Sequence, residues 1–377
     1  MTKGSTAETV DGMSLVKIER LIATLRAERY RWTPVRRHYI AKKHSTKKRP
    51  LGIPTWSDKL LQEVIRQILE AYYEPQFSPT SHGFRPGRGC HTALTEIQQH
   101  WTGTRWFIEG DLAQYFDTIH HDRLIEILSE RIHDNRFLRL IHQLLEAGYL
   151  EEWKHHKTLS GVPQGGVLSP LLSNIYLDRF DHYITQRLVP AYTRGKQRRR
   201  NPAYQQLCAQ LSSTKHKGKP DEMQSLLKQR RSIPSGDPND PNYRRLRYLR
   251  YADDFLLGLV GTHQEAHAIK SIIGEFLRTD LNLELSDTKT LITRASTTAA
   301  RFLGYEITNQ QNNTKTTTTR RNYKLRSVNG VISLRVPRTV LEQKCARYTQ
   351  GGKPLPRREL EAESDFAIVT KYQQEYR

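Results

Sequence analysis

The chain has 377 residues, of which 36% are hydrophobic, so it can bury a substantial core in two or three domains. Lysine and arginine outnumber aspartate and glutamate by 60 to 39, which gives a formal net charge of +21. A balance this basic indicates a polyanionic partner, and nucleic acid is the usual one. No stretch approaches the roughly 20 apolar residues of a membrane-spanning helix, so no membrane partner is expected.

The cysteines and the amino terminus indicate where the protein works. Cys90, Cys208 and Cys345 are far apart and lack the spacing of metal ligands, so we expect free thiols in a reducing compartment. Met1-Thr-Lys-Gly-Ser5 lacks the apolar segment of a signal peptide. These features predict a protein of a reducing compartment, cytoplasmic or organellar, rather than a secreted one.

The first part of the chain predicts a helix followed by a basic β-ribbon. Apolar residues recur with helical spacing over Val16–Tyr30. In residues 36–54, short apolar runs flank a polar tip that carries Lys42 and Arg49, as in a two-stranded ribbon. Cations at such a tip suit a triphosphate or a nucleic-acid backbone, although charge runs are more commonly solvated loops.

A glycine-rich loop follows the helix predicted over 57–69. Within residues 81–91, Arg85 and Arg88 stand among three glycines around Phe84. Glycines let backbone amides approach a ligand, and guanidinium groups pair with phosphates. An ordinary glycine and proline loop would have the same composition, so both interpretations stay open at this point.

Two predicted strands end in acidic side chains. Residues 106–111 are typical of a strand that delivers Asp111 at its edge, and residues 248–260 of a β-hairpin with Asp253 and Asp254 at its tip. Alone, the Asp-Asp pair would simply favour a turn. If the two strands are neighbours in one sheet, the carboxylates converge, and their repulsion calls for a cation. Mg²⁺ prefers carboxylate oxygens, and two such ions suit nucleotidyl transfer.

The chain between and beyond these strands predicts helices, a glycine turn and an insertion. A Pro-Gln-Gly-Gly turn carries Gln164 and leads into a helix that ends near residue 188. Residues 190–247 are polar and basic, as in an insertion that is either a solvated excursion or a nucleic-acid contact. The other predicted helices span residues 121–132, 136–148, 202–212, 221–231 and 264–277.

The carboxyl-terminal part predicts short strands and then basic helices. Residues 281–292, which include Lys289, predict a strand, a turn and a second strand. Phe302–Ile307 predicts one short strand. A polar, threonine-rich connection follows over 309–321, and helices are expected from Ile332 onward.

Taken in order, these motifs resemble the reverse transcriptases encoded by group II introns, which also serve as maturases. The resemblance covers roughly residues 10–377, and the ordered set of motifs is a far more specific signal than any one of them. The motifs are Arg49-Pro-Leu-Gly-Ile-Pro54, Gly83-Phe-Arg-Pro-Gly-Arg88, Asp111 with Phe116-Asp117, Gly161-Val-Pro-Gln-Gly-Gly-Val-Leu-Ser-Pro170, Tyr251-Ala-Asp-Asp254, Ser286-Asp-Thr-Lys289 and Phe302-Leu-Gly-Tyr305.

The resemblance implies an α+β fold of the right-hand polymerase type, with fingers, a palm built on an antiparallel sheet, and a partial helical thumb. It assigns residues 1–104 to the fingers and 105–308 to the palm with interleaved fingers helices, the palm holding the basic insertion at about 190–247. Residues 309–377 would form a connection and part of the thumb or maturase region. The amino end is expected to be short, and the carboxyl end to fall inside the thumb or maturase region.

The resemblance also implies a role for each motif residue. The three aspartates would hold two Mg²⁺ ions, and Lys289 would assist the departing pyrophosphate. Phe116 would disfavour a 2′-hydroxyl, and Gln164 would contact the incoming nucleotide and the template. Ala41 stands before Lys42 where the family pattern has proline. The implied catalytic residues are Asp111, Asp253, Asp254 and Lys289; the nucleotide-binding residues are Lys42, Arg49, Phe116 and Gln164; the nucleic-acid contacts are Arg85, Arg88, Gly304 and Tyr305.

The expected partners are group II intron RNA, an RNA template with a DNA primer, and dNTPs, while the oligomeric state is not indicated. One alternative is an RNA-binding splicing factor whose polymerase site is incidental. Intact acidic residues favour catalysis, because a pure RNA binder does not need mutually repelling carboxylates. Another alternative is an RNA-dependent RNA polymerase in which Asp117 accepts a hydrogen bond from a 2′-hydroxyl, and Phe116 weighs against it.

Overall fold

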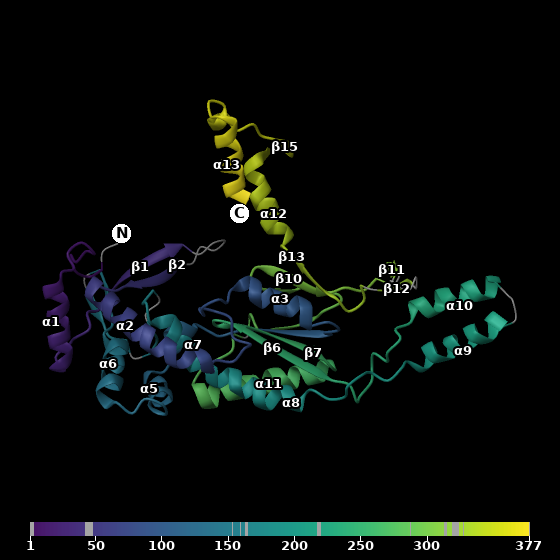
Figure 1. Ribbon diagram of the computed structural model, residues 1–377, viewed down its shortest axis with the longest axis horizontal. Helices are drawn as coiled ribbons and strands as arrows, with labels where there is room; N and C mark the ends of the chain where they lie inside the picture. The colour runs from purple at the N-terminus through teal and green to yellow at the C-terminus, as the bar shows by residue number, and fades with distance from the viewer. Residues whose placement is uncertain are drawn as a thin grey trace.

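The structure, a computed structural model, describes residues 4–41, 48–152, 154–158, 160–162, 165–216, 220–286, 288–312, 315–318, 324–326 and 328–376. The molecule is elongated around a central sheet (Figure 1). A body of helices and a β-ribbon lies at the amino-terminal end, a helical hairpin projects at the other end, and an arm with the chain's carboxyl terminus stands above the sheet.

A four-stranded antiparallel sheet forms the centre of the molecule. Its strands, in spatial order, are β6 (Arg245–Tyr251), β7 (Asp254–Val260), β3 (Trp106–Asp111) and β8 (Leu291–Arg294). The predicted hairpin is confirmed, because β6 and β7 pair directly and are joined by Ala252 and Asp253. Asp111 lies opposite Asp254, so the two predicted acidic strand ends meet at one edge of the sheet.

Both faces of the central sheet are buried, since successive side chains of a strand point to opposite sides. On one face, Ile108 and Leu257 pack with α7 (Ser169–Tyr183) and α11 (His263–Leu281). On the other face, Phe107 packs beneath α3 (Cys90–His100) in a second cluster. Figure 1 shows α3 above the sheet and α11 below it.

A three-stranded sheet completes the second face and corrects two predictions. Its strands are β9 (Ala300–Phe302), β10 (Tyr305–Asn309) and β13 (Ile332–Arg335). The single strand predicted over 302–307 is a hairpin, because Leu303 and Gly304 have φ of +51° and +80° and reverse the chain. Ile332, the expected start of helical material, begins a strand and is 1% exposed.

The strand predicted near Leu281 is also wrong. The helix α11 continues through Leu281 because Leu277 and Leu281 extend its buried stripe. Asn282, with φ of +49°, then ends the helix in the left-handed region. Among the described residues that follow, Leu285 forms an isolated β-bridge with Leu112.

The amino-terminal body combines a second sheet with helices. The predicted ribbon is confirmed as the antiparallel pair of β1 and β2. The helix predicted to reach Tyr30 ends earlier, and Glu28 has φ of +56°. The sheet contains β1 (Val35–Ala41), β2 (Lys48–Ile53), β4 (Tyr149–Glu151) and β5 (Lys154–His156). The helices are α1 (Leu15–Arg26), α2 (Trp56–Tyr73), α5 (His121–Ser129) and α6 (Asn135–Glu146).

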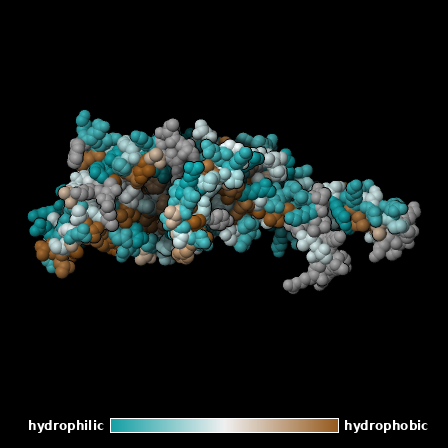
Figure 2. Space-filling view, turned by 90° about the horizontal axis from the view of Figure 1, so that it is seen from above, coloured by the Kyte–Doolittle hydropathy of each residue, from teal (hydrophilic) through white to brown (hydrophobic). Residues whose placement is uncertain are grey.

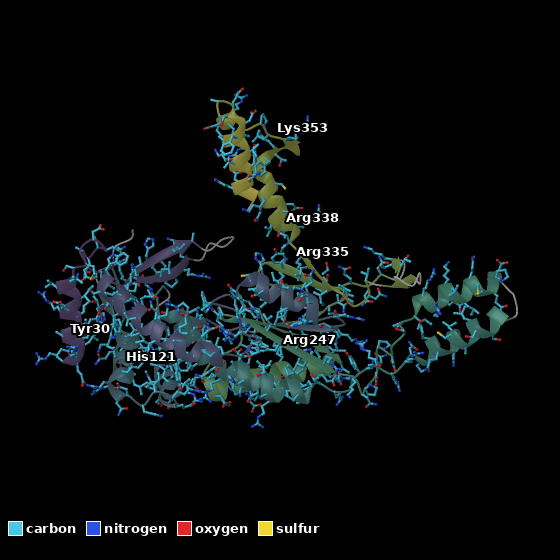
Figure 3. The ribbon with its side chains drawn as sticks, in the orientation of Figure 1. Tyr30, His121, Arg247, Arg335, Arg338 and Lys353 are labelled. Atoms are coloured by element: carbon cyan, nitrogen blue, oxygen red, sulfur yellow. The ribbon has the colours of Figure 1, made fainter. Side chains whose placement is uncertain are left out.

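The insertion and the arm project from the central body (Figure 1). The two helices predicted in the insertion are confirmed as α9 (Pro202–His216) and α10 (Pro220–Ser232). Basic side chains follow the arm, among them Arg335, Arg338 and Lys353 (Figure 3). The arm and its approach contain β11 (Thr316–Thr318), β12 (Lys324–Arg326), α12 (Arg338–Cys345), β14 (Thr349–Gln350), β15 (Lys353–Pro354) and α13 (Asp365–Tyr376).

Short elements complete the chain. They are α4 (Tyr115–Thr118), a π-helical turn (Ile184–Leu188), α8 (Val189–Ala191) and 3₁₀ turns at Glu74–Gln76, Ala346–Tyr348 and Arg358–Leu360. The three cysteines are free, as expected.

Hydrophilic residues cover much of the face in Figure 2, and hydrophobic ones gather at the end where α1 lies, with Leu15 78% exposed. Within the described ranges, none of the helices has the length and apolar character needed to cross a bilayer.

We predict that Gly110→Ala will destabilise the protein by about 1–3 kcal/mol, because the added methyl overpacks the sheet. A Cβ at residue 110 would lie 2.1 Å from Cζ of Phe255, whose side chain is 1% exposed and cannot move aside. Urea unfolding measures the change. The control is Gly274→Ala in α11, where the added Cβ meets Leu285 at an ordinary 3.5 Å. That variant should gain about 0.5–1 kcal/mol from the helix preference for alanine. Equal midpoints for the two variants would contradict this packing argument.

Candidate active site

Three carboxyl groups meet at the end of the central sheet. Asp111 ends β3, Asp254 begins β7 directly opposite, and Asp253 lies in the turn between β6 and β7. Burial raises the pKa of Asp254 to about 7, and the charges of Asp253 and Asp111 add to this effect. Burial also raises the pKa of Asp253, and Asp111 raises it further, against the opposing charges of Arg49 and Lys289. The carboxyls therefore repel one another in a setting that favours a proton or a cation between them.

The turn that carries Asp253 is held by a buried ion pair. Arg250 and Asp181 are 1% and 0% exposed, and their Nη2 and Oδ2 atoms are 2.6 Å apart. Arg250 also donates from Nε to Asp181 at 2.8 Å and from Nη1 to the carbonyl of Ala252 at 2.8 Å. Tyr248 donates its hydroxyl to the same carboxylate at 2.6 Å. The bond to Ala252 matters because this residue has φ of +56°, which is costly for alanine.

The glycine-rich loop predicted near residue 83 packs against this turn. A Cβ at Gly83 would lie only 2.3 Å from the backbone nitrogen of Ala252, so no other residue fits without displacing the turn. The amide of His82 donates to the Arg250 carbonyl at 2.9 Å. Asn174 of α7 donates its side-chain amide to the Gly83 carbonyl, also at 2.9 Å. The loop, the strand β6 and the helix α7 thus fix the turn from three sides.

Lys289 reaches the carboxyl cluster through pairing of the segment before β8. Ser286 donates its amide to the Asp111 carbonyl at 2.9 Å, and the Leu112–Leu285 bridge lies beside it. The Nζ atom of Lys289 lies 2.8 Å from Oδ2 of Asp111. This hydrogen bond raises the pKa of Lys289, so the lysine stays positively charged.

The glycine turn joins the motif around Phe116 to the ribbon strand β2. Gly161 has φ of +93°, and its amide donates to Ile119 at 2.8 Å. Val162 donates its amide to the Phe116 carbonyl at 2.7 Å. On the other side, a Cβ at Gly165 would lie 2.8 Å from the carbonyl oxygen of Gly52 in β2. Three predicted motifs that are far apart in sequence therefore lie together.

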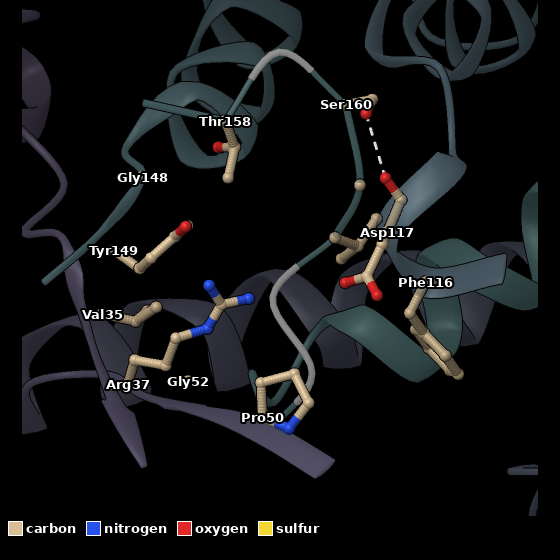
Figure 4. Close-up of a pocket in the computed structure, with 12 residues that line it drawn as sticks. Val35, Arg37, Pro50, Gly52, Phe116, Asp117, Gly148, Tyr149, Thr158 and Ser160 are labelled. Atoms are coloured by element: carbon tan, nitrogen blue, oxygen red, sulfur yellow. Dashed lines mark hydrogen bonds between the residues drawn. The ribbon is translucent and has the colours of Figure 1, made fainter. Parts of the chain in front are cut away.

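A small cavity lies where these motifs meet (Figure 4). Arg37 and Asp117 point into it from opposite sides, and Pro50 and Tyr149 line it. The dashed line in Figure 4 joins the Ser160 hydroxyl to the Asp117 carbonyl at 3.0 Å. The cavity measures about 60 Å³. Ligand pockets usually measure about 300–1,000 Å³, so this cavity suits water rather than a nucleotide.

The comparison with known proteins decides the family. Residues 40–307 match the family described as reverse transcriptase (RNA-dependent DNA polymerase). The chain belongs to the reverse transcriptase family. The matched range contains the carboxyl cluster, the glycine turn and the turn between β9 and β10.

One relative of this chain confirms the resemblance to group II intron proteins. The chain is 41% identical over 391 residues to the group II intron-encoded protein LtrA of Lactococcus lactis subsp. cremoris, which covers 100% of this chain and 65% of that protein. It is 33% identical over 319 residues to protein YkfC of Escherichia coli (strain K12), covering 81% of this chain and 77% of that protein. A telomerase structure from Candida albicans aligns with a TM-score of 0.45 and 12% identity, over 77% of this chain and 48% of that one.

The remaining predicted site residues of the reverse transcriptase lie in different settings. Lys42 and Gln164 fall outside the described residues. Arg85 is 8% exposed and donates to Glu74 and to the carbonyls of Ser78 and Ser81, which favours a structural role. Arg88 donates to the Pro79 carbonyl at 2.6 Å. Gly304 lies in the β9–β10 turn with open space around it, and Tyr305 begins β10 opposite Phe302.

Sequence reasoning missed the residues that hold the site together. Arg250 and Asp181 were not singled out, although a charged residue inside an apolar strand or helix is a detectable signal of a buried pair. Asn174 gives the same signal in α7, where it is buried among apolar neighbours. Phe84 was noticed without a role, yet it is 52% exposed with φ of +56°, beside the Gly83 contact with the turn. A strained, exposed aromatic side chain next to an active-site turn is a candidate for stacking on a base.

Members of the reverse transcriptase family generally use divalent metal ions, and the donor set here fits such an ion. Burial and the nearby charges of Asp253 and Asp111 raise the pKa of Asp254, which favours a proton on this carboxyl, while Lys289 pairs with Asp111. A divalent cation can replace both positive charges. Across the part of the chain that the structure describes, no three His, Cys, Asp or Glu side chains already surround one metal position.

We predict that Arg250→Met will destabilise the protein by about 3–5 kcal/mol, because it leaves the Asp181 carboxylate buried without a positively charged partner. The double variant Arg250→Met/Asp181→Leu should cost less than the sum of the two single variants. Urea unfolding measures all three. Arg338→Met is the matched control, since this arginine pairs with Glu342 but is 90% exposed and should change stability by about 0–1 kcal/mol. A cost for Arg250→Met no larger than that of the control would contradict the role of the pair.

We predict that, at pH values above 7 and without divalent ions, Asp254→Asn will unfold at a higher temperature than the wild type. Between the ordinary pKa of 3.8 and the raised value of about 7, the folded protein binds more protons than the unfolded chain. The stability of the wild type therefore falls as the pH rises through this interval, and the asparagine variant escapes this loss. Thermal unfolding across a pH series measures the difference. Asp122→Asn, at a side chain that is 74% exposed, is the control for the removal of a carboxylate. If the curves of unfolding temperature against pH ran parallel for the wild type and Asp254→Asn, the pKa of Asp254 would not be raised in the folded protein.

Proposed function

We propose that this chain extends a DNA primer on an RNA template by two-metal nucleotidyl transfer, as the polymerase part of a group II intron-encoded protein. The observation that carries the proposal is the pairing of Asp111 with Asp254 across β3 and β7, with Asp253 in the adjoining turn. This arrangement concentrates carboxyl oxygens at one edge of a rigid sheet. The chain spans 65% of the length of LtrA, and the activity proposed is that of the matched part.

Asp111, Asp253 and Asp254 would hold two Mg²⁺ ions. When bound, Mg²⁺ supplies charge neutralisation at the attacking and leaving oxygens of the displacement. The chain's own contribution is position: the sheet and the buried Arg250–Asp181 pair fix the carboxyl groups before substrate arrives. Lys289 stays charged beside Asp111 and would face the departing pyrophosphate once a cation replaces it at that carboxylate.

The incoming dNTP would lie on the open surface between the carboxyl cluster and β2. Arg49 on β2 is close enough to Asp253 to lower its pKa, so its guanidinium can meet a triphosphate held at the same place. Lys42, from the same ribbon, and Gln164, from the glycine turn, would complete the nucleotide site. Phe116 is anchored beneath that turn through its carbonyl, which suits a rigid ring that excludes a 2′-hydroxyl.

The template and primer would be held mainly through their phosphates. Arg88, with one guanidinium nitrogen committed to Pro79, still offers donors next to the exposed Phe84. Gly304 and Tyr305 would guide the primer end as a grip on the β9–β10 hairpin. Arg85 would support this loop rather than contact nucleic acid, because it donates to Glu74 and to the Ser78 carbonyl. Binding through phosphates weakens as salt rises.

The same chain would also bind group II intron RNA and assist splicing, in the bacterial cytoplasm or an organelle. The net charge of +21 supports a large RNA partner. The chain would divide into fingers (1–104), a palm (105–308) and a connection with partial thumb (309–377). β13 pairs with β10, so the sheet beside the last of these boundaries includes residues up to Arg335.

We predict that the wild type extends oligo(dT) on poly(rA) with Mg²⁺ and that Asp253→Asn reduces the rate at least about 1,000-fold, since a metal ligand is lost. Both proteins should retain the same RNA in a filter-binding assay, because Asp253 does not hold the backbone. Extension is measured as incorporated dTTP per enzyme per second.

The outcomes separate the three functions considered. RNA retention without extension by the wild type would leave only the RNA-binding splicing factor. Incorporation of NTPs as fast as dNTPs would favour the RNA polymerase and remove Phe116 as the gate. Asp122→Asn, a distant exposed carboxylate, is the control for charge removal and should extend normally.

A further inference from the structure

A second cationic site lies at the opposite end of β3 from Asp111. A cleft of about 610 Å³ opens beside Trp106, the first residue of the strand. Three arginines from three different segments line it: Arg105 before β3, Arg198 at the base of the insertion, and Arg294 at the end of β8. At about 3.4 Å per residue, the length of β3 separates this cleft from the carboxyl cluster by about 17 Å.

The lining of the cleft is positively charged, and Asp237 and Asp240 partly offset the charge of Arg198 from outside the lining. Among the described residues, the lining includes Arg105, Arg198 and Arg294 but no aspartate or glutamate. Within the described residues, these three arginines form no ion pair within 4.0 Å, unlike the neighbouring Arg199 and Arg244. Burial lowers the pKa of Arg105, and the nearby charges of Arg198 and Arg294 lower it further. Because like charges at this range repel one another, holding the three arginines together destabilises the folded protein.

The three segments are locked to one another by hydrogen bonds. Arg105 donates from Nη1 to the Pro238 carbonyl at 2.7 Å, which ties the base of the insertion to β3. Gly103 donates its amide to Gly330 at 2.8 Å, and Asn309 donates its side-chain amide to Thr104 at 2.6 Å. The frame of the cleft is therefore fixed by hydrogen bonds, and the guanidinium of Arg198 lies over the ring of Tyr243, 5.2 Å from its centroid. Ser235 and Gln311 add neutral hydrogen-bonding groups to the wall.

We propose that this cleft binds backbone phosphates of an RNA, at a site separate from the polymerase site. Guanidinium groups form two-pronged hydrogen bonds with phosphate, and three unpaired ones around one cleft match an oxyanion better than any other ligand class. The choice of RNA as the source of the phosphate rests on the proposed function. The position beside the insertion means that a long RNA could occupy this cleft while a short primer and template occupy the carboxyl end.

The test is the affinity of a labelled single-stranded RNA, measured by fluorescence anisotropy over a series of salt concentrations. The variant is Arg198→Gln/Arg294→Gln, which leaves the structural bonds of Arg105 in place. Each lost phosphate contact should reduce the slope of log affinity against log salt by about 1, which is about tenfold in affinity at 0.1 M salt. Extension of a short primer on a short template should stay at the wild-type rate.

The matched control is Arg136→Gln/Arg139→Gln, which removes the same charge from α6 at the far end of the molecule (Figure 1). These arginines are 67% and 63% exposed and already pair with Glu28, so their loss should change the slope much less. An equal slope for both double variants would overturn the proposal. Because Trp106 lines the cleft, inorganic phosphate at constant ionic strength is tested by tryptophan fluorescence. A phosphate response without any RNA effect would assign the cleft to a free anion and overturn the RNA assignment.

A failure of this proposal is distinguishable from a failure of the proposed function. Asp253→Asn should lose extension and keep the wild-type salt slope, whereas Arg198→Gln/Arg294→Gln should do the reverse. A wild type that does not extend primers, combined with an RNA affinity that depends on the two arginines, would leave the cleft standing and remove only the polymerase.

Discussion

The buried pair of Arg250 and Asp181 is the interaction on which the active-site geometry depends. It is expensive to desolvate two charges, and the cost is recovered only when every donor finds an acceptor. Here Arg250 bonds to Asp181, to Asn174 and Ser81, and to the carbonyl of Ala252, so its donors join a strand, a helix and a loop. The strained turn that carries Asp253 is thus fixed by polar bonds with strict geometry rather than by apolar contacts, which tolerate sliding.

Charged side chains are distributed unevenly in this fold. A chain with a net charge of +21 concentrates three carboxyl groups at one edge of its central sheet, where burial and mutual repulsion raise the pKa of Asp254 to about 7. At the other end of β3, three arginines face one cleft whose described lining includes no aspartate or glutamate. Both clusters cost stability in the isolated protein, and such costs are found where a ligand of opposite charge is to be bound. The strand β3 therefore has the carboxyl cluster, which favours a cation, at one end and the arginine-lined cleft, which favours an anion, at the other.

Close backbone approach explains why glycines recur in the motifs. Gly83 meets the turn at Ala252, Gly161 meets the chain at Phe116, and Gly165 meets β2 at Gly52. Each contact joins segments that are far apart in sequence, and a Cβ at any of them would collide with backbone atoms. The motifs are therefore joints between the ribbon, the loops and the sheet. Their shared requirement is contact with one another, and the nucleotide site proposed above depends on these joints holding their positions.

The sequence by itself determined the strand ends with Asp111, Asp253 and Asp254, the basic ribbon, and the insertion helices, because each follows from local patterns of apolar spacing, turn residues and charge. The ordered motifs also indicated the protein family. Tertiary structure alone decided the register that sets Asp111 opposite Asp254, the ion pair of Arg250 with Asp181, and the meeting of Arg105, Arg198 and Arg294. It likewise extended α11 to Leu281 and turned the chain at Gly304. The physical reason is that pairing and burial depend on partners far away in the chain, which no local window of sequence contains.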